Sequence, residues 1–511
     1  MRQTEPHDLN RNRPIVNPIR SLVSQTAIYG VSSIVGRFLN YLLVPLYTYY
    51  FSTGEYGVVS ELYAYAGFFA VVLAFGLETG YFRFRRQDED AEKVYGTALS
   101  FVLVANLVFV LAIVLGLEPL AALLRYSEHP EYLLWFALML GCDGLSSLPF
   151  ARLRAENRAG RFAAIKIAEI LVTIALNLFF IVYCRRQYQI APDSWVAQVY
   201  DPSIGVGYIF ISNLIASVFK LALLSPQLLG LAAGVDFSLL KRLLGYSLPM
   251  VVIGLAGIVN EMLDRAVLKF LLPYDLDTNL QMLGIYGACY KLSILMSLFI
   301  QAFRYAGEPF FFAYSGNHDA KRIYATVLRY FVIFCVFVFL LVSLYLDVFQ
   351  YFIGPRFRVG LPVVPILLLA NLFLGIYVNL SVWYKLTDRT LLGAWVALCG
   401  AVLTVVLNIW WVPSYGYVGS AWAHLVCYSG MTVASYLLGR RYYPVDYRMR
   451  TITAYVAFGL VLYFGNAELL HVTGWHPLLT GTGFLATYLM AVLLLEGEAL
   501  GLRSVSRRRA R

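Results

Sequence analysis

The sequence predicts an all-α membrane protein of about fourteen transmembrane helices. Three observations lead to this fold class: 60% of the residues are hydrophobic, only 14% are charged, and long apolar runs recur between residues 22 and 496. Soluble domains carry roughly 25% charged residues, whereas a helix that spans a bilayer needs about 20 mostly apolar ones. The stretches between the apolar runs are too short to form a separate soluble domain.

The predicted helices follow one another along nearly the whole chain. Each begins and ends where an apolar run meets polar or turn-forming residues, and each is long enough to cross the hydrocarbon core once. The fourteen predicted helices comprise residues 22–48, 57–82, 95–116, 131–151, 162–184, 203–225, 246–272, 282–312, 323–346, 362–384, 391–412, 417–438, 451–469 and 477–496.

Lys and Arg are distributed unevenly between the loops on the two sides of the predicted membrane. Loops on the side of the termini hold 27 of the 40 basic residues. Because basic loops stay in the cytoplasm, both termini are predicted to be cytoplasmic. The net charge of +10 is explained by this topology, so no nucleic-acid partner is expected. The opposite loops hold five basic residues: Arg125, Arg185, Arg186, Arg356 and Arg358.

A weak internal repeat relates the first two helices to the seventh and eighth. EYGVVSELYAYAGFF can be aligned with QMLGIYGACYKLSIL so that Gly57 matches Gly284 and Tyr63 matches Tyr290. Chance similarity between two aromatic-rich segments is the alternative. A true repeat implies two six-helix halves that enclose a substrate site near the membrane midplane.

The predicted domain organisation follows from this repeat. A cytoplasmic segment precedes the first bundle, a cytoplasmic linker joins the bundles, and two further helices lead to a basic cytoplasmic tail. The predicted parts are the cytoplasmic segment 1–21, the first bundle 22–225, the linker 226–245, the second bundle 246–438, the two further helices 451–496 and the basic tail 497–511.

Eight basic side chains lie inside the predicted helices. A cation in hydrocarbon costs about 2.5–3.5 kcal/mol on insertion scales, so it normally faces a partner or a wet cavity. A polytopic protein with a cationic interior is most simply a carrier for an anionic substrate. The eight are Arg37, Lys166, Lys220, Arg265, Lys269, Lys291, Arg304 and Arg329.

Three of these cations are the best candidates for a substrate site. Arg37 lies near the centre of the first helix, and Lys291 has no acid within four residues. Arg265 belongs to a helical series, Glu261, Asp264, Arg265 and Lys269, which is expected to share one face and to line a cavity. Lys269 by itself is expected to extend toward the membrane interface. For the remaining cations, an ion pair with a nearby acid or a position at the membrane interface is an equally good explanation.

Intramembrane acids are the candidates for coupling transport to an ion. A carboxylate can bind H⁺ or Na⁺ and release it when water re-enters a cavity. A purely structural counter-charge is the alternative for each. The candidates are Glu261, Asp264, Glu61 and Asp143.

The sequence predicts neither catalysis nor a bound cofactor. The six cysteines lie in or at the ends of apolar segments without metal-ligand spacing, and there is no ATP-binding motif. Of the six histidines only His424 lies within a predicted helix, with no acid beside it in the sequence, and it is interpreted as a helix-packing residue. The 38 tyrosines exceed the needs of interfacial belts, and a tyrosine-lined cavity would suit sugar rings.

Several segments of the chain are similar to those of a known family. They are YGVSSIVGRFLNYLLVPLYTYYFSTGEYGVVSELYAYAGFF, FLGIYVNLSVWYKLTDRT and VVLNIWWVPSYGYVGSAWAHLVCYSGMTVASYLLGRRYYPV. The turn with Pro413, Gly416 and Gly419 is the most specific piece. These segments resemble oligosaccharide flippases of the polysaccharide transporter (Wzx-type) family, whose superfamily also includes MATE exporters and lipid II flippases. The resemblance covers essentially the whole chain.

The resemblance implies a flippase of the bacterial cytoplasmic membrane, built as two six-helix bundles in a V around a cationic cavity. Such a protein is not an enzyme; it moves an undecaprenyl-diphosphate-linked oligosaccharide, such as an O-antigen, capsule or exopolysaccharide unit, by alternating access. On this interpretation Arg37, Arg265 and Lys291 bind the diphosphate and Arg304 receives it from the cytoplasm. Expected partners are the lipid-linked glycan, membrane lipid, and the polymerase and glycosyltransferases of the same pathway.

Two other functions are compatible with a membrane protein of this kind. A MATE-like exporter of small solutes would share the fold but would need an acidic cavity, which the excess of intramembrane cations disfavours. A membrane-embedded glycan polymerase or ligase would need a polar catalytic centre, and neither the short outer loops nor the histidines supply one.

Overall fold

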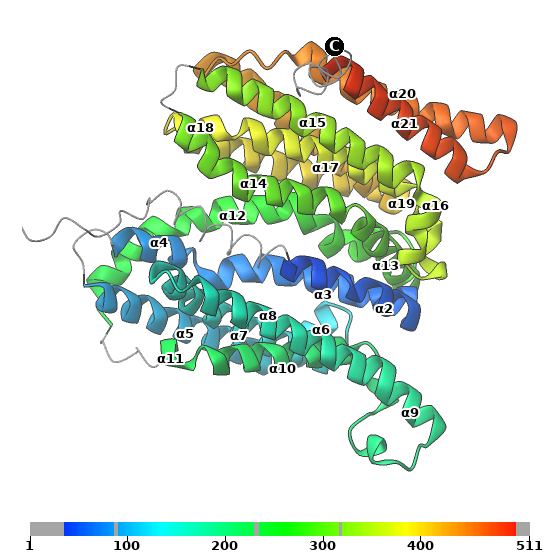
Figure 1. The fold of residues 1–511 in the computed structure, drawn as a ribbon. Coiled ribbons are helices and arrows are strands. Elements are labelled where there is room, and N and C mark those ends of the chain that lie inside the picture. The colour runs from blue at the N-terminus through cyan, green and yellow to red at the C-terminus, as the bar shows by residue number, and fades with distance from the viewer. Residues whose placement is uncertain (1–34, 86–89, 229–234, 316–318, 497–511) are drawn as a thin grey trace, which may run out of the picture.

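The computed structural model describes residues 35–85, 90–228, 235–315 and 319–496. These residues form helices joined by short connections, and no strand occurs among them. Figure 1 shows the helices stacked in two layers, with the N-terminal half in the lower layer and the C-terminal half above it. The all-α fold class predicted from composition is confirmed.

The first half begins with a helical segment at residues 35–41 and α2 (Leu43–Tyr50). The remaining elements of this half alternate long helices with short ones. They are α3 (Thr53–Ala74), α4 (Leu77–Phe84), α5 (Ala91–Leu115), α6 (Leu117–Leu123), α7 (Pro130–Ala155), α8 (Ala159–Asn177), η1 (Leu178–Cys184), α9 (Arg185–Ile190), η2 (Trp195–Gln198), η3 (Pro202–Ile204), α10 (Gly207–Leu223) and α11 (Ser225–Leu228).

The second half begins with α12 (Phe237–Leu271), which lies beside the first half in Figure 1. Two last helices, α20 and α21, lie outside the second layer. The remaining elements are α13 (Leu276–Leu292), α14 (Ile294–Tyr314), α15 (Ala320–Leu344), α16 (Leu346–Phe349), η5 (Gln350–Phe352), η6 (Pro355–Gly360), α17 (Val363–Leu380), α18 (Val382–Leu386), α19 (Thr390–Tyr442), α20 (Met449–Thr473) and α21 (Pro477–Glu496).

The number of membrane-crossing helices agrees with the sequence-based prediction of about fourteen. Ten described helices are long and apolar enough to cross a membrane, and α13 with α14, bent by 50°, adds an eleventh. α19 covers the two predicted helices 391–412 and 417–438. They meet at a kink at Gly416, whose φ of 61° and ψ of −150° are not helical. α10 is apolar but short, with 17 residues, and the first predicted helix lies partly outside the described residues.

Two of the differences from the predicted boundaries have a clear local cause. The helix predicted at 57–82 breaks into α3 and α4 because Phe75 and Gly76 both adopt left-handed backbone angles. α12 begins at Phe237, within the predicted cytoplasmic linker. There Asp236 accepts hydrogen bonds from the amides of Ser238 and Leu239, which caps the helix nine residues earlier than the apolar run begins.

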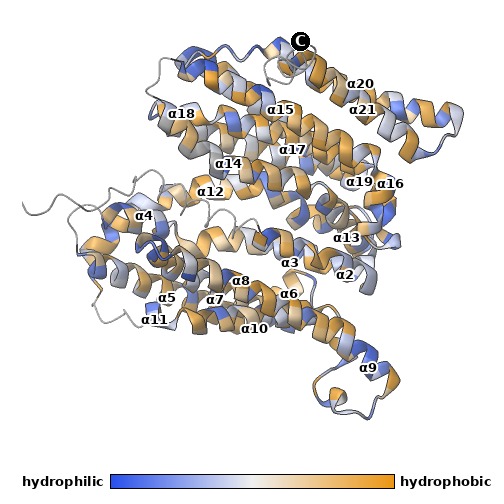
Figure 2. Ribbon diagram, viewed as in Figure 1, coloured by the Kyte–Doolittle hydropathy of each residue, from blue (hydrophilic) through white to orange (hydrophobic). Residues whose placement is uncertain are grey.

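The outer surface of the helices is apolar. On α5, the side chains of Val104, Leu107, Val108 and Leu111 are each more than half exposed. Figure 2 shows hydrophobic residues along the lengths of the helices and hydrophilic ones gathered near their ends, for example around α9. A soluble protein could not tolerate so large an exposed apolar surface, so the helices are in contact with lipid.

The two halves pack against each other through glycines. At the crossing of α3 and α13, a Cβ atom on Gly57 would lie 2.1 Å from the Leu280 carbonyl oxygen. A Cβ atom on Gly284 would lie 1.8 Å from the Thr53 carbonyl oxygen. The two glycines matched by the internal repeat therefore occupy equivalent positions in one crossing, as an internal two-fold axis would place them.

A second glycine contact joins the halves where α4 meets α12. A Cβ atom on Gly76 would lie 2.8 Å from the Ser247 carbonyl oxygen, and one on Gly80 would lie 2.5 Å from the Ser247 hydroxyl. The halves are thus in close contact at two levels along α3–α4. A cavity lies between these levels.

The last two helices are attached to the outside of the second half. The Tyr488 hydroxyl of α21 donates to the Ile333 carbonyl of α15, and Arg329 of α15 forms an ion pair with Glu496 at 3.3 Å. Arg329 is therefore held by a counter-charge at the end of α21. Neither residue lines the cavity between the halves.

Candidate substrate site between the two halves

The cavity between the halves has a volume of about 350 Å³. Residues 35–41, α2, α3, α8 and α10 line it from the first half, and α12, α13 and α14 from the second. Its charged lining residues are Arg37, Glu261, Arg265 and Lys291. Three of the four cations predicted to bind diphosphate thus surround one cavity, together with one of the predicted coupling acids.

Arg37 and Lys291 are the lining cations that form no direct ion pair with a described acid, although Glu261 of the same cavity acts on Lys291 at longer range. Arg37 is exposed within the cavity and Lys291 is half-buried in its wall. Within the described part of the chain, neither side chain has a hydrogen-bond or ion-pair partner. Because they come from opposite halves, a bound anion could connect the two halves through them.

Arg265 differs from these two cations because much of its charge is already compensated. Its Nε lies 3.3 Å from an Asp264 carboxylate oxygen, and its guanidinium carbon lies 3.9 Å from the centre of the Tyr290 ring. A terminal nitrogen donates to the Glu261 carbonyl. These contacts fix the orientation of the guanidinium, which is only 7% exposed and lies at the cavity wall.

Asp264 lies behind Arg265 and does not line the cavity. Its carboxylate accepts hydrogen bonds from the Tyr286 hydroxyl and from the backbone amide of Arg265. It also lies 2.9 Å from Nε2 of His424 on α19. The sequence predicted His424 to be a packing residue with no acidic partner. The structure gives it one, Asp264, which lies 160 residues earlier in the chain.

Glu261 is the predicted coupling acid that faces the cavity. Its side chain is exposed there, and no described side chain forms an ion pair with its carboxylate. The expected single face of four ionisable residues on α12 does not form. Glu261 and Arg265 line the cavity, whereas Asp264 and Lys269 are buried outside its lining by polar partners.

Lys269 and Glu61 form a fully buried ion pair between the two halves. The ammonium nitrogen lies 2.8 Å from a Glu61 carboxylate oxygen, and both side chains have no exposed surface. Lys269 also donates to the Leu124 carbonyl, and Glu61 accepts from the hydroxyls of Tyr65 and Tyr126. The expectation that Lys269 extends toward the interface is wrong, because a complete set of polar partners holds it in the interior.

Asp143 takes part in a separate charge cluster inside the first half. The Lys220 ammonium lies 2.6 Å from both Asp143 and Glu169, and the Ser217 hydroxyl donates to Asp143. Lys166 lies 3.4 Å from Glu169. This cluster does not contribute to the cavity lining, and its two cations are each held by an acid.

Arg304 is exposed on α14 and does not line the cavity. It lies one turn beyond Gln301, which is a lining residue. The structure therefore separates Arg304 from the other three predicted diphosphate ligands.

Tyrosines supply much of the remaining cavity surface. The Tyr63 hydroxyl accepts a hydrogen bond from the Asn213 amide, and the Tyr47 hydroxyl donates to Asn177. Rings with polar edges suit sugars, because the ring faces contact C–H groups and the edges meet hydroxyls. The lining tyrosines are Tyr41, Tyr47, Tyr56, Tyr63 and Tyr290.

Among the described residues, no group of three or more His, Cys, Asp or Glu side chains could hold a metal ion. The chemistry of the cavity is therefore that of unpaired cations, one acid and aromatic hydroxyls. It suits binding and release of an anionic, sugar-containing molecule.

Sequence comparison decides the family. A family profile described as polysaccharide biosynthesis protein matches residues 50–353, which is more than half of the chain. The chain belongs to this family. The resemblance to polysaccharide flippases inferred from the sequence is confirmed at this level. A comparison with curated protein sequences found no match.

Solved structures define the fold. A lipid II flippase MurJ structure in an inward closed conformation is similar with a TM-score of 0.68 at 14% identity, covering 94% of this chain and 100% of that one. An inward-facing multidrug resistance MATE family transporter of the MOP superfamily is similar with a TM-score of 0.58 at 15% identity, covering 85% and 96%. The chain thus has the same fold as this lipid II flippase and this multidrug resistance transporter.

Proposed function

We propose that this protein is a flippase that translocates an undecaprenyl-diphosphate-linked oligosaccharide across the cytoplasmic membrane by alternating access. The observation that carries the proposal is the cavity between the halves, which has three cations and one acid in its lining and in which Arg37 and Lys291, from opposite halves, form no direct ion pair with a described acid. Membership of the polysaccharide biosynthesis protein family supports a glycan as the cargo. The protein acts as a transporter, with its termini in the cytoplasm, and not as an enzyme.

The diphosphate is the part of this substrate that the cations would hold. Arg37 and Lys291 supply uncompensated positive charge from the two halves, and Arg265 presents an oriented guanidinium at the wall. A guanidinium donates two hydrogen bonds to two phosphate oxygens, whereas an ammonium acts as a point charge. Arg304, exposed beyond the cavity on α14, would contact the diphosphate before it reaches this site.

The sugars would lie against the tyrosines while the prenyl chain stays in the lipid. A volume of about 350 Å³ is near the lower end of the range for small-molecule sites. A longer glycan therefore requires the halves to separate, which the two glycine contacts along α3–α4 would permit by opening one at a time.

Glu261 is the residue that we propose to couple this cycle to H⁺ or Na⁺. Its carboxylate faces the cavity, so it can lose or gain a cation as water enters. Asp264, Glu61 and Asp143 would first have to release their present partners. The polymerase and glycosyltransferases of the same pathway are the proposed partners.

The test is translocation of a short undecaprenyl-diphosphate oligosaccharide in proteoliposomes. Arg37→Ala/Lys291→Ala is the informative variant, because neither side chain has a described partner whose loss would unfold the protein. We expect it to fold normally and to lose translocation. Lys166→Ala, which removes a cation outside the cavity, is the matched control and should translocate normally.

Full translocation by the double variant would overturn the assignment of the site. Uptake of a small soluble cation by the wild type, with no movement of the lipid-linked glycan, would instead indicate an exporter. In that case Glu261 would be the substrate ligand.

A further inference from the structure

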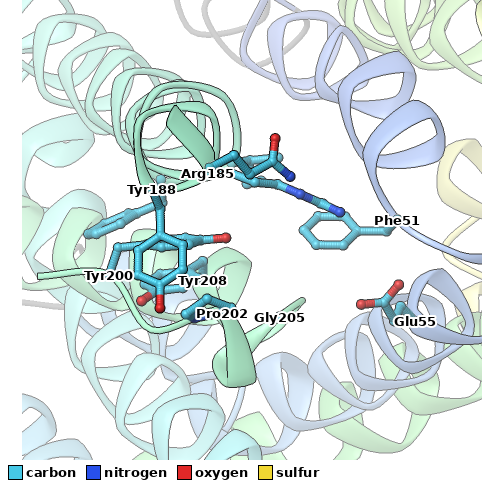
Figure 3. A pocket seen from close by; sticks show the side chains of 11 residues that line it. Phe51, Glu55, Arg185, Tyr188, Tyr200, Pro202, Gly205 and Tyr208 are labelled. Carbon is cyan, nitrogen blue, oxygen red and sulfur yellow. The ribbon is translucent and has the colours of Figure 1, made fainter. Parts of the chain in front are cut away.

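A second pocket, with a volume of about 300 Å³, lies within the first half. One wall comes from the junction of α2 and α3, and the other from the segment η1–α9–η3–α10 (Figure 3). No charged residue of the central cavity contributes to it. The pocket is near Arg185, on the side of the membrane that the distribution of basic loops predicts to be the outer one.

One wall of this pocket is a series of aromatic rings. The rings of Tyr200 and Tyr208 stack with centroids 4.9 Å apart, and Tyr208 stacks on Phe180 at 4.7 Å. Tyr188 extends the series, 5.8 Å from Tyr200. Figure 3 shows the three tyrosines together on one side of the pocket and Phe51 on the other. Rings that already pack against one another form a fixed surface, so little entropy is lost when a ligand binds.

Polar groups lie at the edges of this aromatic surface. Figure 3 shows the Glu55 carboxylate directed into the space between the walls and the Arg185 guanidinium reaching across toward Phe51. One Glu55 oxygen accepts from the Ser52 amide, and one Arg185 nitrogen donates to the Tyr50 carbonyl. These bonds hold the two side chains in place and leave further acceptor and donor capacity facing the pocket.

The charges identify the chemical class of ligand. One acid and one base make the pocket neutral in sum, unlike the cationic central cavity, so it does not select a diphosphate. Aromatic faces combined with fixed hydrogen-bonding edges match sugar rings, which have C–H faces and hydroxyl edges. The ligand that fits best is a neutral saccharide.

The pocket and the central cavity are lined by residues of the same elements: α3, the continuous helix α8–η1, and α10. On α8–η1, Thr173 lines the cavity and Ile181 lines the pocket. On α10, Asn213 lines the cavity and Tyr208 lines the pocket. Between the two spaces the buried Tyr47 hydroxyl donates to the Asn177 side chain at 3.0 Å. Buried side chains that include this polar pair therefore separate the two spaces.

The helix geometry changes at this dividing pair. Directly after Asn177 the helix adopts π geometry over Leu178–Cys184, and π segments occur often at functional sites. Tyr47 also lines the central cavity, so a ligand there contacts one member of the pair directly.

We propose that this outer pocket is a second saccharide-binding site, which holds the glycan on the release side after it has left the central cavity. This inference rests on the proposed flippase function. In this later state the diphosphate would still occupy the cationic cavity, while the sugars, which first lay against the cavity tyrosines, would occupy the aromatic pocket beyond the Tyr47–Asn177 pair.

The test uses the full-length protein in lipid nanodiscs and the repeat-unit glycan of the source cell, released from its lipid diphosphate by mild acid. Binding of this free glycan is measured by calorimetry. We expect Tyr188→Ala to weaken binding about tenfold, as loss of one aromatic contact would. Tyr188→Trp, which keeps a ring, should restore it. Gln189→Ala, which removes an exposed amide from the same pocket, should weaken binding to a smaller extent.

Two controls separate this inference from the proposed function. Tyr183→Ala removes an exposed ring of η1 that does not line the pocket, and it should bind as the wild type does. Arg37→Ala/Lys291→Ala should also bind the free glycan normally while losing the lipid-linked one.

Each outcome bears on one of the two proposals. If the wild type translocates the lipid-linked glycan but Tyr188→Ala binds the free glycan as well as wild type, the outer pocket is refuted and the flippase function stands. If Tyr188→Ala loses binding but the wild type translocates no lipid-linked glycan, the saccharide pocket stands and the flippase function fails.

Discussion

The central cavity and the buried contact between α3 and α12 use intramembrane charge in opposite ways. Beside the cavity, Arg37, Lys291 and Glu261 face open space and form no direct ion pair with a described side chain. A few turns away, Lys269 and Glu61 are completely buried and fully paired. For this reason we assign the proposed substrate site to the charges that form no ion pair and a structural role to those that are paired.

The comparison also explains why both kinds of charge belong to one protein. A buried pair between halves is costly to break once formed, so it resists relative movement of the halves. Unpaired cations on opposite walls of the cavity repel each other until an anion binds between them. The Lys269–Glu61 ion pair would favour the closed arrangement of the halves, and a bound anion would neutralise the positive charge of the cavity.

Removing one partner of the buried pair should have the largest effect on stability. Lys269→Met leaves the Glu61 carboxylate buried without a counter-charge, and such losses cost about 3–5 kcal/mol. We expect a marked fall in the thermal unfolding temperature of the purified protein in detergent. The double variant Glu61→Gln/Lys269→Met should recover much of the loss, because no buried charge remains. Equal stability of the single variant and the wild type would show that the pair does not hold the halves together.

Neutralising the unpaired acid should have a much smaller effect on stability. Glu261→Gln removes a charge with no described partner, so the unfolding free energy should change by no more than about 0.5 kcal/mol. Translocation by this variant should no longer depend on an imposed H⁺ or Na⁺ gradient. A variant that is strongly destabilised, or that keeps its gradient dependence, would remove Glu261 from the coupling role.

The parts of the fold that were predictable from sequence are those encoded locally. Apolar runs located the helices, because each run lies within about 20 to 30 residues of sequence, whereas the orientation inferred from the basic loops stays a prediction. The matched glycines Gly57 and Gly284 were also visible as a repeat, although their direct contact was not. The break at Phe75 escaped prediction, since nothing in its neighbourhood requires a non-glycine residue to adopt left-handed angles.

The candidate site was predictable only as a set of charges. Arg37, Lys291 and Glu261 were singled out because they have no obvious use in a helix, and the structure places them around one cavity. The partners of Lys269 and His424 come from helices more than 100 residues away, so spacing along one helix could not identify them. The periodic spacing of charges on α12 predicted one cavity-lining face. Partners on distant helices instead bury Asp264 and Lys269, and only Glu261 and Arg265 line the cavity.

The most direct test of the unpaired-cation account is the affinity of the purified protein for undecaprenyl diphosphate itself, without any sugar. Loss of two charge-assisted contacts, each worth about 1.5–3 kcal/mol, should weaken binding to Arg37→Ala/Lys291→Ala by about 100-fold or more relative to wild type and Lys166→Ala. Binding by the double variant that equals the wild type would contradict the account, because the diphosphate would then be held elsewhere.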